Sequence, residues 1–320
     1  MCELPTSGSC LTHEDMEPIT LLPVKQSNGG IVYKQLEEAI KKTGVPREII
    51  ADYGSDLKAG IETFCQKHPE TDYIYDIKHF TAILLKHELQ NEEEWINFRD
   101  LAVKTKQQLQ QTDLAFLSPP NQRSKARYMN IDILVQWGQK TLYFLEHKIE
   151  TNDQNRIREK LGWLEEYRDS LFKWKKIMQV IGITESHVRK KGYFLGSHLE
   201  LKKLLADNIT PRVPEISKTL LDFVKIQESK LKTGERLLGS SEIIESVLGK
   251  QKHLEHEQSK SGFTGLLLGI AAIVASTTTE VVFKAIETVP THKVLTWCKE
   301  YLGQSLQGKR MEAFCVPKTE

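Results

Sequence analysis

A carboxylate, Asp52, follows a short apolar run in the stretch Arg47–Asp56, which reads REIIADYGSD. The run Glu48–Ala51 is too short for a helix, which predicts a buried strand with Asp52 at its C-terminal end. Ligands and metals gather at that end of open α/β sheets, because the loops leaving it vary while the sheet holds them rigid. Asp52 is therefore a candidate metal ligand. The alternative is that Asp52 only caps a helix starting near Ser55 or Asp56.

Two further carboxylates, Glu242 and Glu245, lie far downstream in the stretch Gly239–Lys252, which reads GSSEIIESVLGKQK. The serines predict the start of a helix, and glutamates three positions apart share a helix face. Lys250 and Lys252 follow on the same element. The alternative is an ordinary first turn whose acidic residues complement the helix dipole, with lysines that only keep the helix soluble.

A basic segment, Gln122–Asn130, reads QRSKARYMN and alternates cations beside a tyrosine. Such a segment could bind a DNA backbone through its cations, with the tyrosine stacked on a base. An ordinary solvated loop explains the same residues equally well. The DNA-binding candidates are Arg123, Lys125, Arg127 and Tyr128.

Composition restricts the class of protein. The chain has 320 residues, of which 39% are hydrophobic, so one large or two ordinary cores are expected. The 44 Lys+Arg nearly balance the 43 Asp+Glu, so the net charge of the chain does not indicate attraction to nucleic acid or to a membrane surface. Five cysteines without metal-ligand spacing, and no signal peptide, predict a reduced, cytoplasmic setting. The apolar run Gly265–Ala275 is shorter than the roughly 20 residues of a membrane span and predicts a buried helix.

The elements around Asp52 alternate between helix and strand. A helix is predicted over Ile31–Lys42, ending at Gly44, then the strand before Asp52, then a helix over Leu57–Lys67. A second strand, Tyr73–Tyr75, ends on Asp76. This order is typical of an α/β fold. The apolar residues expected on the two helix faces are Ile31, Leu36, Ala39 and Ile40, and Leu57, Ile61 and Phe64.

From Lys78 to about Lys232 strand-like alternation disappears and apolar residues recur every three or four positions, which predicts an all-helical block. Ser118-Pro119-Pro120 and the prolines Pro211 and Pro214 are predicted to mark turns between its helices.

Taken in order, these motifs resemble DDE-type transposases of bacterial insertion sequences. The motifs are a strand ending in Asp-x-Gly-Ser-Asp-Leu, a strand ending in Asp-Ile-Lys-His-Phe, and a distant helix written Ser-Ser-Glu-Ile-Ile-Glu-Ser. The resemblance covers most of the chain and includes Gln110-Gln111-Thr112, Ser118-Pro119-Pro120, Lys125–Asn130 and Ser261-Gly262-Phe263-Thr264. It implies an RNase H-like catalytic core with a large all-α insertion, in a chain that is predominantly helical overall.

The resemblance also implies a site. Asp52 matches the second catalytic aspartate and Glu245 the catalytic glutamate, with Glu242 the weaker match for the latter. Two Mg²⁺ or Mn²⁺ ions held by such carboxylates would cleave and join phosphodiesters of transposon ends and target DNA. Asp76 and His79 are possible groups around the metals, against a capping role for Asp76. The family's proteins commonly act as dimers on paired DNA ends, and no membrane partner is implied.

The family's first catalytic aspartate has no match in this chain. Asp15, in the polar stretch Leu11–Glu17, has no apolar run leading into it. The core is therefore expected to be incomplete, as in the C-terminal part of a transposase, with little or no strand transfer by this polypeptide alone.

The predicted organisation has three parts: a partial RNase H-like core over residues 1–90, the all-α insertion over 91–235, and C-terminal helices over 236–320 that return to the core with Glu245. Two readings from other classes stay open. One is a non-catalytic DNA-binding or regulatory fragment that pairs with intact transposase and inhibits it. The other is a helical scaffold without a nucleic-acid role.

Overall fold

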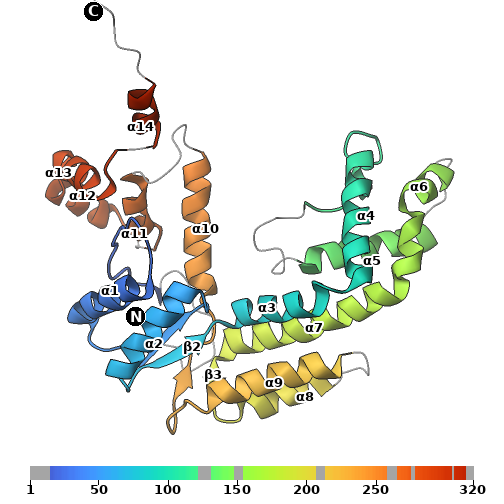
Figure 1. Ribbon diagram of the computed structural model, residues 1–320, viewed down its shortest axis with the longest axis horizontal. Coiled ribbons are helices and arrows are strands. Elements are labelled where there is room, and N and C mark those ends of the chain that lie inside the picture. Colours follow the sequence, from blue (N-terminus) through green and yellow to red (C-terminus); the bar gives the residue numbers. More distant parts are fainter. Residues whose placement is uncertain are drawn as a thin grey trace, which may run out of the picture. The chain divides into compact units, whose positions relative to one another are not determined.

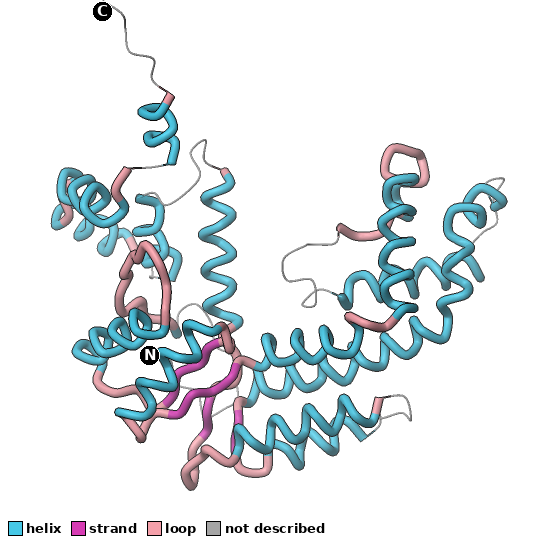
Figure 2. The backbone as a smooth tube through the Cα atoms, viewed as in Figure 1, coloured by secondary structure: helices cyan, strands magenta, loops and turns pink. Residues whose placement is uncertain are grey.

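A computed structural model describes residues 15–121, 131–147, 154–206, 213–257, 265–274, 278–304 and 306–314. The chain divides into two compact units. The first unit joins Met1–Ile74 to Ser240–Glu320, and the second consists of Tyr75–Gly239. The chain thus leaves the first unit after Ile74 and re-enters it at Ser240. Helix prevails in both units, as Figure 2 shows, so the predicted predominantly helical fold is confirmed.

The first unit begins with a helix, a strand, a helix and a second strand, and all four agree with the sequence-based prediction within two residues. Their bounds are α1 Gly29–Thr43, β1 Glu48–Ala51, α2 Ser55–Lys67 and β2 Asp72–Tyr75. The returning chain adds α10 Glu242–His256, η5 Gly265–Leu268, α11 Gly269–Val274, α12 Thr279–Thr288, α13 Thr291–Trp297, η6 Cys298–Leu302 and α14 Leu306–Ala313 (Figure 1).

Strands β1 and β2 form a two-stranded sheet. The N–H of Asp72 donates to the carbonyl of Arg47 at 3.0 Å, and the Thr71 hydroxyl donates to the carbonyl of Pro46 at 2.6 Å. Because both strands start at the same end, they run parallel and their carboxyl ends share one edge. The prediction of a buried β1 is wrong: its residues are half-buried, since only one strand pairs with it in the part of the chain that the structure describes.

Helices α1 and α2 pack closely against each other. The Asn28 side chain caps α1 by accepting the N–H of Ile31 at 2.9 Å, and Gly44 ends the helix in the left-handed region at φ 75°. A Cβ at Gly60 of α2 would lie 2.5 Å from the Val32 Cβ, so the crossing requires glycine there. On α2, Ile61 and Phe64 are buried as predicted.

Two helix faces differ from prediction. On α1 the one buried residue is Val32, while Ile31, Leu36, Ala39 and Ile40 are half-buried. On α2, Leu57 is exposed, because the first turn of the helix lies outside its packed stretch.

The second unit is helical apart from two very short strands. Its elements are α3 Ile77–Leu89, α4 Glu93–Leu109, η2 Ala115–Leu117, α5 Ile131–His147, α6 Gln154–Leu161, η4 Gly162–Tyr167, α7 Arg168–Lys191, β3 Tyr193–Phe194, α8 Ser197–Ala206, α9 Pro214–Glu228 and β4 Arg236–Leu237. Its core contains an aromatic cluster in which Trp174 of α7 lies edge-on to Trp95 and close to Phe98, both on α4.

The antiparallel pairing of β3 with β4 corrects the all-helical prediction. Tyr193 lies opposite Leu237 and Phe194 opposite Arg236, and a two-residue strand is too short to show alternation in the sequence. Of the two prolines predicted to mark a turn between helices, Pro211 lies outside the described residues, and Pro214 follows the connection between α8 and α9. It is the first residue of α9, where proline's fixed φ and missing N–H suit a helix start. The break at Ser118-Pro119-Pro120 does lie between helices, as predicted.

The apolar run from Gly265 is not the single buried helix that the sequence predicts. It divides into the 3₁₀ turn η5 and the short α11, and most of its side chains there are half-buried or exposed. Glycines at 265 and 269 weaken a continuous helix. Within the described ranges, no helix is long and apolar enough to cross a membrane.

A carboxylate at the end of α9 holds the start of α8. Glu228 Oε1 accepts the N–H of Gly196 at 2.7 Å, and Oε2 accepts the N–H of His198 at 3.0 Å and lies 2.7 Å from its ring Nδ1. Burial opposes the charge of Glu228, but these hydrogen bonds outweigh burial and hold its pKa below the usual value.

We expect Glu228→Gln to lower the free energy of unfolding by about 1–2 kcal/mol at neutral pH, because the amide offers one acceptor oxygen and no charge. The pKa of Glu228 is lower in the folded than in the unfolded chain. Its contribution is therefore present above the unfolded-state pKa and is lost as the pH falls through the folded-state pKa. Urea unfolding at neutral and acidic pH should show the two proteins converging in acid. A difference that is independent of pH would contradict this account.

Candidate functional site

Asp52 lies at the carboxyl end of β1, where the sequence places it. Its Oδ1 accepts the N–H of Gly54 at 3.0 Å, and the Tyr73 hydroxyl donates to its carbonyl oxygen at 2.5 Å. The first bond closes a local turn of the kind Asp favours, just before α2 begins. The second ties the turn to β2. The Asp52 side chain is half-buried, so its position is fixed while it stays accessible to solvent.

Glu245 lies in the first turn of α10, also in the first unit. Its N–H donates to the carbonyl of Ser241 at 3.2 Å, and the Ser240 hydroxyl accepts the N–H of Glu242 at 3.3 Å. A helix therefore starts directly after the serines, as predicted, but Ser241 at the N-cap position makes no side-chain capping hydrogen bond. Glu245 is half-buried and Glu242 exposed, because positions three apart are still offset by about 60° around a helix.

A backbone hydrogen bond links the segment that follows β2 to the segment that precedes α10. The N–H of Ile77, two residues after β2, donates to the carbonyl of Gly239 at 3.0 Å. The chain therefore leaves the end of β2 and returns to the same point, and α10 begins three residues later, as can be followed in Figure 1. Asp52 follows the neighbouring parallel strand, and Glu245 lies in the first turn of the helix that starts at this edge.

Asp76 belongs to the second unit and is fully buried. Its Oδ1 accepts the N–H of His79 at 2.9 Å, which makes it the N-cap of α3. The capping role is therefore present. A role of Asp76 or His79 around a metal stays a prediction.

The predicted DNA-binding residues fall into two groups. Lys250 and Lys252 are exposed on α10, away from the face that buries Val247 and Gln251. The Gln251 Nε2 donates to the carbonyl of Leu266 at 3.1 Å, which joins α10 to η5. The basic segment with Arg123, Lys125, Arg127 and Tyr128 lies outside the described residues, as does Ser261-Gly262-Phe263-Thr264.

The donor chemistry of Asp52 and Glu245 fits a hard divalent ion. In the ranges that the structure describes, no group of three or more His, Cys, Asp or Glu side chains is assembled for a metal. Two carboxylates suffice for Mg²⁺, which usually keeps several waters and takes its remaining ligands from substrate phosphates.

Comparison with protein-family models, with curated proteins and with solved structures finds no match to this chain.

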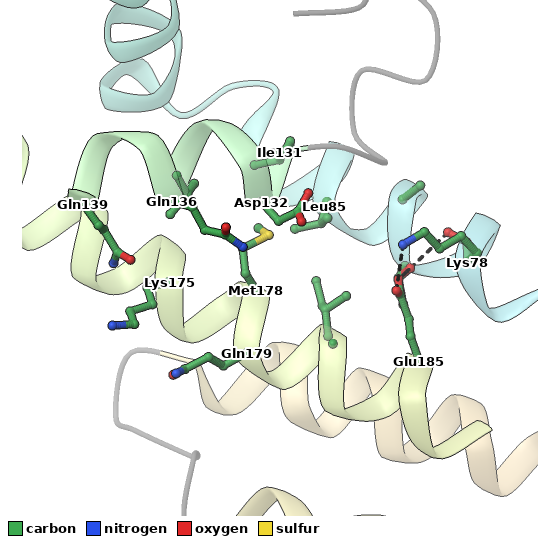
Figure 3. Close-up of a pocket in the computed structure, with 15 residues that line it drawn as sticks. Lys78, Leu85, Ile131, Asp132, Gln136, Gln139, Lys175, Met178, Gln179 and Glu185 are labelled. Carbon is green, nitrogen blue, oxygen red and sulfur yellow. Dashed lines mark hydrogen bonds and ion pairs between the residues drawn. The ribbon is translucent and has the colours of Figure 1, made fainter. Parts of the chain in front are cut away.

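A cavity of about 410 Å³ in the second unit was missed by sequence reasoning. It lies between α3, α5 and α7, and the view in Figure 3 shows glutamine side chains from α5 and α7 around it. At one end the Lys78 ammonium and the Thr81 hydroxyl both donate to the Glu185 carboxylate, at 2.8 Å and 2.5 Å. The sequence carries no signal for this cavity, because glutamines at helical spacing are typical of the solvent-exposed face of a helix.

Proposed function

We propose that this chain is a DDE-type transposase polypeptide, with an RNase H-like core interrupted by a helical insertion. Its chemistry is metal-dependent cleavage and transfer of DNA phosphodiesters. Asp52 and Glu245 are the metal ligands, and Lys250 and Lys252 contact DNA phosphates near them.

One observation supports the proposal most. Parallel strands β1 and β2 share a carboxyl edge that Asp52 follows, and the chain that leaves this edge returns to it at Gly239, directly before the helix of Glu245. The long insertion therefore separates the two acids in sequence without moving the start of α10 away from the sheet. A sheet edge with a returning helix is the layout that such a site needs.

The role of this chain's residues is to hold and orient. The Asp52 carboxylate is oriented by the Gly54 N–H, and the Glu245 carboxylate is carried on a regular helix turn. A divalent ion bound there would activate a water or a 3′ hydroxyl and stabilise the leaving oxygen. Exposed lysines on α10 then add charge that holds a DNA backbone.

Metal binding tests the shared site. We expect the chain to bind Mn²⁺ weakly, and Asp52→Asn and Glu245→Gln each to weaken the affinity about tenfold or more, because each removes one of two protein ligands. The double variant should be little weaker than either single variant, since the two ligands serve one ion. Electron paramagnetic resonance of free Mn²⁺ measures this.

Glu242→Gln is the matched control, because it changes an exposed glutamate on the same helix turn. It should bind Mn²⁺ like the natural chain. Equal effects of Glu242→Gln and Glu245→Gln, or additive losses in the double variant, would contradict a site shared by Asp52 and Glu245.

Without a match for the first catalytic aspartate, we expect at most trace strand transfer by this polypeptide alone. Incubation with the element's terminal DNA and Mg²⁺, resolved on a denaturing gel, measures this. A robust reaction that Asp52→Asn abolishes would overturn the expectation. It would mean that two carboxylates are sufficient for strand transfer. DNA binding that is independent of metal and of both acids would favour the regulatory reading instead.

A further inference from the structure

The second unit has a groove of about 780 Å³ between η2, α5 and α7, here called the aromatic groove. Three of its lining side chains are large, apolar and exposed: Phe116 at 72%, Tyr143 at 55% and Ile133 at 51%. Trp137 and Phe144 add half-buried rings. Exposed apolar side chains that gather at one concave site mark an interaction surface, whereas single ones scattered over a protein do not.

Hydrogen bonds fix the walls of the aromatic groove. The Trp137 Nε1 donates to the carbonyl of Leu117 at 3.0 Å, which ties η2 to α5 and holds the neighbouring Phe116 in place. The Gln139 Nε2 donates to the carbonyl of Leu171 at 3.1 Å, which ties α5 to α7. The walls are therefore preorganised, which lowers the cost of binding there.

The Tyr143 ring already takes part in a stack. It lies 4.3 Å from the His147 ring at an angle of 20°, and the His147 Nδ1 lies 3.0 Å from the Tyr143 carbonyl oxygen. Both residues are exposed in the last turns of α5. Two nearly parallel, exposed rings are a platform on which a further flat ring stacks.

The charge of the aromatic groove is positive. Lys140 of α5 and Lys175 of α7 are exposed lining residues, and no carboxylate lines the groove in the part of the chain that the structure describes. Neither acid of α5 lines it: Asp132 lines the cavity beside α3, and Glu146 pairs with Arg168 at 2.5 Å. The occupant that complements this surface is therefore negatively charged.

We propose that the aromatic groove binds an unpaired DNA strand. The exposed rings stack on base faces, which every base offers whatever the sequence, and the two lysines contact phosphates of the same strand. An acidic peptide would pair with the lysines but does not require the stacked rings, and the bases of a duplex are covered by their own stacking. The choice of DNA rests on the proposed function, but the groove contains neither Asp52 nor Glu245.

A strand without bases is the sharpest probe. A labelled thymidine strand of roughly 12 nucleotides, a length typical of such sites, is titrated with the full chain and followed by fluorescence anisotropy. The same strand annealed to its complement, and an abasic strand of equal length, keep the phosphates but offer no open base faces along the strand. We expect the unpaired strand to bind at least about tenfold tighter than either. A uridine RNA strand of equal length should bind no tighter than the DNA.

Phe116→Ala and Tyr143→Ala each remove one ring and should weaken binding of the thymidine strand about tenfold. Because both side chains are mostly exposed, the thermal midpoint should stay unchanged. Phe283→Ala is the matched control, because Phe283 is 63% exposed on α12 of the first unit. This control, and Tyr143→Phe, which keeps the ring, should bind like the natural chain.

Lys140→Gln should reduce the slope of log affinity against log salt concentration by about one, as the loss of a phosphate contact does. Lys218→Gln, at an exposed position of α9, is its control. Asp52→Asn should leave binding of the strand unchanged, so that failure of the metal site and failure of the groove are told apart.

Equal binding of the thymidine and abasic strands would overturn the proposal, since the lysines alone would then explain binding, as for an acidic peptide. Duplex binding as tight as strand binding, no binding at all, or natural affinity in both Phe116→Ala and Tyr143→Ala would overturn it as well. Tighter binding of RNA would contradict the choice of DNA. Loss of strand binding in Asp52→Asn would place the strand at the metal site instead of the groove.

Discussion

Trp174→Ala is expected to lower the free energy of unfolding of the second unit by about 3–5 kcal/mol, the range for removing a buried tryptophan. The Trp174 side chain is 0% exposed. Its ring lies 4.9 Å from that of Trp95, at 86°, and 5.0 Å from that of Phe98. Its Nε1 also donates to Glu92 Oε2 at 3.1 Å, so truncation leaves a cavity and removes one of the donors to this carboxylate, which Lys173 still contacts.

Phe172→Ala is the matched control, because Phe172 lies on the same helix and is 49% exposed. Its effect should stay within about 1 kcal/mol. Denaturant unfolding followed by hydrogen exchange assigns each loss to a unit. Equal losses in the two variants would mean that α7 does not present the Trp174 face to the core.

Phe64→Ala is the second large effect, again about 3–5 kcal/mol, in the first unit. The Phe64 side chain is 0% exposed, and its ring lies 4.3 Å from the His68 ring. The other buried side chains of this helix pair are Ile61 and Val32, so the Phe64 ring is a large share of the core between the two helices. Loss of α2 packing should also loosen the turn at Asp52 and weaken Mn²⁺ binding.

Leu57→Ala tests the same helix at a site that the sequence wrongly assigns to the buried face. Leu57 is 39% exposed, so the variant should lose about 1 kcal/mol or less and keep Mn²⁺ binding. If Leu57→Ala proved as damaging as Phe64→Ala, the predicted face would be right and the observed packing of α2 wrong.

The local elements around the candidate site could be predicted because each carries its own signal. The short run Glu48–Ala51, followed by a turn, identifies β1, and serines followed by two glutamates three positions apart identify the start of α10. Asp76 before a helical run predicts the N-cap of α3. In each case neighbours in the sequence determine the structure.

Other features depend on partners distant in sequence and left no local trace. The β3–β4 pair exists because Tyr193 meets Leu237, and no two-residue window reveals that. The run from Gly265 looks uniformly apolar, yet it divides into η5 and α11. The cavity of the second unit is lined by residues of α3, α5 and α7, which only the fold brings together.

The most direct test of the central claim, that Asp52 and Glu245 hold one metal site, is cleavage of the backbone by hydroxyl radicals generated at bound Fe²⁺. We expect cuts close to residue 52 and close to residue 245, both suppressed by excess Mg²⁺ and both lost in Asp52→Asn or in Glu245→Gln, because radicals act only near the ion. Cuts near one acid alone, or cuts that survive either substitution, would contradict the claim.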